Sequence, residues 1–121
     1  MVTFNFYNPT RIVFGSGKLS TLHEQALPGK KALLLISNGK STKLNGSLNT
    51  VETQLDEAGV KCVLFDKIME NPVKEVIMEG AAYARANNCD FILALGGGAV
   101  LDSSKAIAAM ATNDGHLWDY V

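Results

Sequence analysis

Three short and mostly apolar runs divide the chain, at residues 32–36, 61–65 and 91–95. Runs of this length are typical of strands that are buried on both faces, as in a parallel sheet. Apolar residues at helical spacing separate them. They predict helices over residues 48–58, with Gly59 as the C-cap, and from the Asn71-Pro72 pair to about residue 87. Asn71 would then be the N-cap of the second helix, with the proline at its first position.

The alternation of strands and helices predicts the fold class. Parallel strands linked through helices need right-handed crossovers, which gives a layered α/β domain. The N-terminal part is less regular, since residues 11–14 suit a short strand and residues 18–27 a short amphipathic helix. We interpret residues 1–17 as a β-hairpin or as an arm that pairs elsewhere, and residues 30–121 as the α/β core.

Three contiguous glycines follow the third apolar run and precede a helix of almost uncharged sequence that ends near residues 112–115. They are Gly96, Gly97 and Gly98, followed by Ala99. Glycines let the backbone turn sharply and let a ligand approach it, and a helix N-terminus attracts phosphate. The pattern is neither G-x-G-x-x-G nor a P-loop. It indicates a pyrophosphate site, or else a tight turn with no ligand.

The loop after the first run carries small polar residues and no acid. It contains Asn38, Gly39, Lys40 and Ser41. An acidic side chain at such a place holds ribose hydroxyls and repels a 2′-phosphate, so its absence favours NADP(H) over NAD(H). The alternative is an ordinary solvated turn.

Two further positions have a functional and a structural interpretation. Asp102 and Lys105 share a helix face after the glycines, where they either serve a ligand or only pair with each other and with the helix dipole. Asn71 is a helix cap or a ligand contact. The loops after parallel strands lie on one edge of a sheet, so residues 38–41, Asn71 and residues 96–99 are expected to form a cleft.

Composition narrows the class of protein. The chain has 121 residues, 47% of them hydrophobic and 19% charged, with a net charge of −1. This is a single globular domain with no electrostatic case for nucleic acid or an anionic membrane. We see no membrane-spanning run and no signal peptide, and we interpret Cys62 and Cys89 as core residues in a reducing, cytoplasmic compartment. His23 and His116 have no metal-ligand spacing, and no catalytic residue is assigned in this chain.

Four motifs carry a family resemblance. They are NPTRIVFGSG at residues 8–17, the Asn71-Pro72 pair, GGGAVLDSSK at residues 96–105 and DGHLWD at residues 114–119. With these motifs the chain resembles the N-terminal part of the iron-containing alcohol dehydrogenase family. It is most similar to the butanol dehydrogenase and NADPH-dependent aldehyde reductase branch.

The resemblance implies an oxidoreductase that moves a hydride between a nicotinamide dinucleotide and a small alcohol or aldehyde. In such enzymes iron, or sometimes zinc, acts as a Lewis acid on the substrate oxygen. Gly96–Ala99 would hold the pyrophosphate and Asp102 would lie in the nucleotide cleft. Asn38, Gly39 and Ser41 would meet the adenosine ribose. Ala99 departs from the serine that is common in the family.

The family draws its metal ligands, one Asp and three His, from a helical domain that we expect to be missing from this chain. The chain would therefore supply cofactor binding only. It would also leave one edge of the strand at residues 91–95 unpaired, which favours poor solubility or a homo-oligomer. The alternatives are a stand-alone nucleotide- or phosphate-binding module, and a relative of dehydroquinate synthase or glycerol dehydrogenase.

Overall fold

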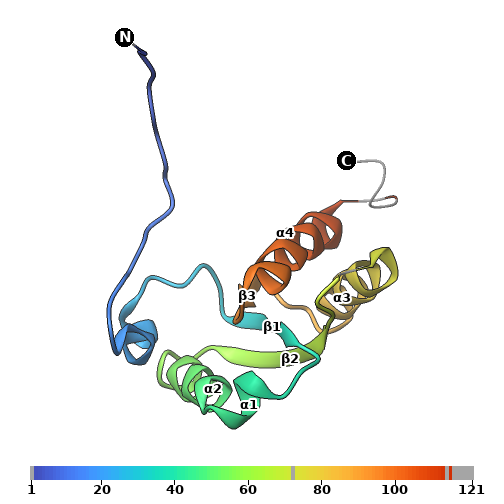
Figure 1. Cartoon of the computed structure of the whole chain (residues 1–121). Coiled ribbons are helices and arrows are strands. Elements are labelled where there is room, and N and C mark those ends of the chain that lie inside the picture. The colour runs from blue at the N-terminus through green and yellow to red at the C-terminus, as the bar shows by residue number, and fades with distance from the viewer. Residues whose placement is uncertain (1, 72, 114, 116–121) are drawn as a thin grey trace.

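The computed structural model describes residues 2–71, 73–113 and 115. Its centre is a parallel sheet with the strand order β2-β1-β3 (Figure 1). The strands are β1 (Lys31–Ser37), β2 (Lys61–Ile68) and β3 (Phe91–Ala94). The predicted layered α/β fold with three parallel strands is confirmed. β2 continues three residues beyond the predicted end of its run.

Helices cover both faces of the sheet (Figure 1). They are the 3₁₀ helix η1 (Lys18–Glu24) and the α-helices α1 (Ser41–Leu44), α2 (Ser47–Glu57), α3 (Lys74–Ala86) and α4 (Gly98–Thr112). η1 is shorter than the predicted helix over residues 18–27. The short helix α1 was not predicted and begins at the end of the loop after β1.

Two apolar cores lie on opposite faces of β1, because successive side chains of a strand alternate between faces. Leu33 and Leu35 pack with residues of α3 and α4. Leu34 and Ile36 pack with residues of α2. Residues 32–36 are therefore all buried, which explains why the run is continuously apolar.

The strand order creates a switch point between β1 and β3. The chain leaves β1 toward β2 through α2, then returns past β1 to β3 through α3 on the other face. At such a point the connections leave the sheet in opposite directions, and a crevice opens beyond the carboxyl ends of the strands. This crevice is where ligands bind in open α/β sheets.

The prediction that Asn71 caps a helix is wrong. α3 begins at Lys74, and its N-cap residue is Val73, with φ −111° and ψ 154°. Because this backbone is extended, the helix cannot include Val73 or begin before it. Val73 makes no side-chain capping hydrogen bond, and Pro72 lies outside the described residues.

The described part of the N-terminus, residues 2–14, contains no strand and no hairpin. We call these residues the arm; they run away from the body of the domain as an extended segment (Figure 1). The strand predicted over residues 11–14 is wrong, because no neighbouring strand lies there to accept and donate its backbone hydrogen bonds. The interpretation of these residues as an arm that pairs elsewhere stays a prediction.

Candidate nucleotide-binding cleft

A cleft of about 440 Å³ opens at the carboxyl edge of the sheet. Residues from the loops after all three strands line it: Ser37, Asn38 and Gly39 after β1, Met69 and Glu70 after β2, and Gly97, Gly98, Ala99 and Val100 after β3. The structure thus brings five of the predicted residues to one cavity, from the first and third loops. The other four predicted residues, Ser41, Asn71, Gly96 and Asp102, do not line it.

The glycine turn forms the wall of the cleft on the β3 side. Gly96 has φ +155°, and a Cβ built on it would lie 2.8 Å from Val100 Cγ2. Gly97 has extended backbone and precedes the first residue of α4, without a side-chain capping bond. Gly96 therefore has no room for a side chain, unlike the glycines that follow it.

Gly97 and Gly98 leave open space at the start of α4. Both are exposed, and a Cβ on either would meet nothing within 4 Å. The first intrahelical bond runs from the Leu101 N–H to the Gly97 carbonyl, over 3.0 Å. The amides of the preceding three residues therefore have no helical acceptor. With no acidic residue in the first turn, this end of α4 fits a phosphate group.

The loop after β1 is tied to both of its neighbours. The Asn38 N–H donates to the Ile68 carbonyl at the end of β2, over 2.8 Å. The Gly39 N–H donates to Ser37 Oγ, over 3.3 Å. In the helix that follows, Lys43 Nζ lies 2.7 Å from Asp66 Oδ2, and its hydrogen bond holds the pKa of that carboxyl below its usual range. These contacts fix the loop beside the glycine turn.

Asp102 and Lys105 make only a weak pair. Their Oδ1 and Nζ atoms are 4.0 Å apart, and both side chains are 80% exposed. Surface pairs of this kind contribute little to stability, so this ion pair gives neither residue a clear structural role. The role of Asp102 in the nucleotide cleft stays a prediction.

The sequence interpretation missed Ser37, Met69, Glu70 and Val100 as lining residues. Ser37 is the last residue of β1, and Val100 belongs to the first turn of α4. Met69 and Glu70 follow β2 directly, but the predicted strand ended at residue 65. A strand that reaches Ile68 brings them to the carboxyl edge. The signal was available in the apolar Ile68-Met69 pair.

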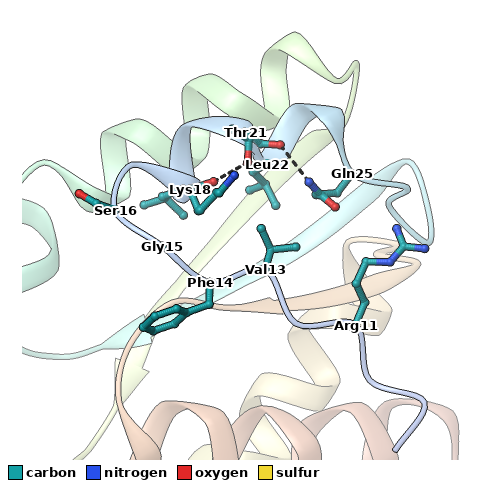
Figure 2. A pocket seen from close by; sticks show the side chains of 10 residues that line it. Arg11, Val13, Phe14, Gly15, Ser16, Lys18, Thr21, Leu22 and Gln25 are labelled. Carbon is teal, nitrogen blue, oxygen red and sulfur yellow. Dashed lines mark hydrogen bonds between the residues drawn. The ribbon is translucent and has the colours of Figure 1, made fainter.

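A second groove, of about 510 Å³, lies at the base of the arm against η1 (Figure 2). Val13 from the chain before η1 points toward Leu22 of η1, and Arg11 and Lys18 also line the groove, whereas the Phe14 ring points away from these side chains. It shares no lining residue with the cleft over the glycine turn. The two cavities are therefore separate features.

Neither a metal centre nor a membrane span is found in the described ranges. No group of three or more His, Cys, Asp or Glu side chains lies close enough there to hold a metal ion. Within those same ranges, no helix is both long enough and apolar enough to cross a bilayer.

The strand order and the glycine turn define a Rossmann-like α/β domain, a class that binds dinucleotides at the switch point. Residues 9–121 match the model of the iron-containing alcohol dehydrogenase family, and the chain belongs to that family. The predicted resemblance is confirmed.

The relatives that are similar to this chain include proteins named for NADH and proteins named for NADPH. A probable NADH-dependent butanol dehydrogenase of Bacillus subtilis (strain 168) is 40% identical over the whole chain, which spans 31% of that protein. The NADPH-dependent aldehyde reductase of Escherichia coli (strain K12) is 40% identical over 92% of the chain and 28% of its own length.

The fold comparison agrees. The crystal structure of NADH-dependent butanol dehydrogenase A from Thermotoga maritima matches 97% of this chain with a TM-score of 0.89 and 36% identity. The match spans 30% of that structure. The chain therefore corresponds to less than a third of the length of these relatives.

Proposed function

We propose that this chain binds a nicotinamide dinucleotide for an oxidoreductase that interconverts an alcohol and an aldehyde. The observation that carries the proposal is the uncapped N-terminus of α4, which opens through Gly97 and Gly98 into the cleft. Family membership supplies the reaction class, since the family uses NAD(P)H and a metal.

Each wall of the cleft has a part in this proposal. Gly96–Ala99 hold the pyrophosphate with the free amides at the start of α4, and Gly96, whose φ of +155° favours glycine, shapes the turn that presents them. Asn38 and Gly39 meet the adenosine ribose. Ser41, Asn71 and Asp102 remain predicted contacts at the margins of the cleft.

The metal chemistry belongs, in this proposal, to the part of the relatives that the chain does not span. Iron or zinc supplies a Lewis acid to the family reaction. The described residues offer no group that holds such an ion. We therefore expect no alcohol oxidation from the 121-residue chain with added iron or zinc, and sustained turnover would refute this division of labour.

We further propose a preference for NADP(H), which rests on the loop after β1. That loop carries Lys40 and no acid, and it lines the cleft through Asn38 and Gly39. A cation and small polar residues accept a 2′-phosphate, whereas an acid there would repel it. The relatives include both NADH- and NADPH-dependent proteins.

Titration of the chain with NADPH and with NADH, followed by nucleotide fluorescence, tests the proposal. We expect saturable binding of both nucleotides, with the tighter constant for NADPH. Equal or tighter binding of NADH would refute the loop argument and leave the dinucleotide site standing. A chain that circular dichroism shows to be folded, yet binds neither nucleotide, would refute the proposed function.

We also propose an oligomeric state and a cellular compartment for the protein. The chain works as a homo-oligomer, because β3 is an edge strand of the described sheet and the arm exposes large apolar side chains. It works in the cytoplasm, because Cys62 and Cys89 are free thiols, as is usual in a reducing compartment.

A further inference from the structure

Glu70 is the one ionisable side chain among the described residues that line the cleft. It is exposed and follows β2. Within the part of the chain that the structure describes, it forms no ion pair with a basic side chain. Its carboxylate is therefore available to a ligand and gives the cleft a local negative charge.

The sheet places Glu70 relative to the phosphate site. Along the carboxyl edge, Glu70 follows β2, Asn38 and Gly39 follow β1, and the glycine turn follows β3. Neighbouring strands are about 4.8 Å apart, so the ends of β2 and β3 are separated by roughly 10 Å. If a phosphate binds at the start of α4, the nucleoside attached to it can extend along this edge, first past the loop after β1 and then toward Glu70.

We propose that Glu70 is a specificity-determining residue that opposes the binding of a 2′-phosphate. This inference rests on the proposed function of the cleft. A carboxylate at the ribose end accepts hydrogen bonds from the 2′- and 3′-hydroxyls of NAD(H). The same carboxylate repels a phosphate that carries a charge of about −1.5 to −2.

Glu70 thus counteracts the loop after β1. The acid that is absent from residues 38–41 enters the same cleft from the next loop, because β2 is longer than its apolar run. The chain should discriminate against NADH less strongly than the loop alone implies. Glu70 reduces the difference in affinity between the two nucleotides, while the amides of α4 hold the pyrophosphate of both.

The test compares Glu70→Gln with the matched variant Glu52→Gln. Both changes remove one exposed carboxylate at nearly constant shape. Glu52 lies on α2 and lines a separate cavity with Lys31 and Lys61, where β1 and β2 begin. Dissociation constants for NADH and NADPH are measured by nucleotide fluorescence on the full chain, and circular dichroism verifies that each variant is folded.

We expect Glu70→Gln to raise the affinity for NADPH relative to NADH by about two- to fivefold, the range of exposed charge interactions. The effect should shrink as salt is added, because exposed charges are screened. Glu52→Gln should leave the ratio unchanged. An unchanged ratio in Glu70→Gln, or an equal change in both variants, would overturn the role of Glu70.

A second measurement separates the ribose from the rest of the dinucleotide. 5′-AMP and adenosine 2′,5′-bisphosphate are titrated as competitors, and Glu70→Gln should favour only the bisphosphate. One outcome is that the wild type binds both dinucleotides while Glu70→Gln changes neither the NADPH-to-NADH affinity ratio nor the bisphosphate-to-AMP affinity ratio. In that case the proposed function of the cleft stands and the specificity role of Glu70 is refuted. If the folded wild type binds neither dinucleotide, the proposed function fails, and the role of Glu70 fails with it.

Discussion

At the scale of single residues, we expect two glycines of the turn to have different roles: Gly96 serves the turn itself, and Gly97 serves access to the ligand site. Gly96 combines φ +155° with a close approach to Val100, so a side chain there is strained and lacks space. Gly97 has φ −87° and nothing within 4 Å of a built Cβ. The sequence could not separate these cases, because a run of glycines looks the same whether it serves a turn or a ligand.

Gly97→Ala tests this division. We expect its free energy of unfolding to stay within about 0.5 kcal/mol of the wild type, because the methyl group meets open space. Nucleotide affinity should fall about tenfold or more, because the methyl group occupies the space through which a phosphate reaches the amides of α4. Urea denaturation and nucleotide fluorescence measure the two quantities.

Gly96→Ala is the matched control, since it adds the same methyl group one residue earlier. It should lower the free energy of unfolding by about 1–3 kcal/mol through backbone strain and contact with Val100. A Gly97→Ala variant that unfolds as readily as Gly96→Ala would show that both glycines serve the turn alone.

At the scale of elements, Leu22 of η1 packs on the core that α2 helps to form, and His23 adds polar contacts from η1 to α2. The His23 backbone N–H donates to Gln54 Oε1 over 3.0 Å, and His23 Nδ1 contacts the same oxygen. His23 Nδ1 also lies 3.3 Å from Glu57 Oε2. The hydrogen bond to Gln54, together with the charges of Glu57 and Glu24, raises the pKa of His23 above its ordinary value of 6.5.

This raised pKa gives the contacts of His23 a pH dependence of known sign. A group whose pKa is higher in the folded state binds its proton more tightly there. Its contribution to stability is complete below the ordinary pKa and is lost as the pH rises through the raised pKa. The thermal stability of the wild type relative to His23→Gln should therefore be larger at about pH 5.5 than at about pH 8.5.

Thermal unfolding followed by circular dichroism measures this difference. The control is His116→Gln, which removes the other histidine of the sequence. Replacing His23 should cost more thermal stability at about pH 5.5 than at about pH 8.5 also in a chain that carries His116→Gln. The His116→Gln change alone should not remove this pH dependence. A difference that is the same at both pH values would mean that protonation of His23 does not strengthen its contacts.

The strand ends show what a pattern of apolar residues can and cannot predict. The run at 32–36 predicted β1 well, because every one of its residues is buried against a core. β2 was predicted too short because Asp66 and Lys67 interrupt its apolar run. In the structure both charged residues lie within the strand, where Asp66 pairs with Lys43 and Lys67 Nζ lies 2.5 Å from Glu79 Oε1.

That error at the end of β2 accounts for two of the four missed lining residues, Met69 and Glu70. With the strand ended at residue 65, Glu70 falls in the middle of a loop. With the strand extended to Ile68, Glu70 lies at the carboxyl edge beside Asn38. The partners of Asp66 and Lys67, which are Lys43 and Glu79, are distant in the sequence and are not visible in the local pattern. The local sign that the strand continues was the apolar Ile68-Met69 pair beyond the two charges.

At the scale of the whole molecule, the arm and the edge of the sheet are the features that the domain leaves uncovered. The arm exposes large apolar side chains by 74% or more at six positions: Val2, Phe4, Phe6, Tyr7, Ile12 and Phe14. Figure 1 shows it extending away from the body. Large apolar side chains gathered on one segment are typical of an interaction surface, and an unpaired strand edge offers free backbone groups.

These two features make different predictions for association. If the arm drives it, a chain lacking residues 2–14 should sediment as a monomer at concentrations where the full chain is oligomeric. If the open edge of β3 drives it, the shortened chain should remain oligomeric. We expect the arm to dominate, because six strongly exposed apolar side chains offer far more area than one four-residue strand edge. Analytical ultracentrifugation of both chains distinguishes the cases, and a full chain that is monomeric throughout would contradict the proposed homo-oligomer.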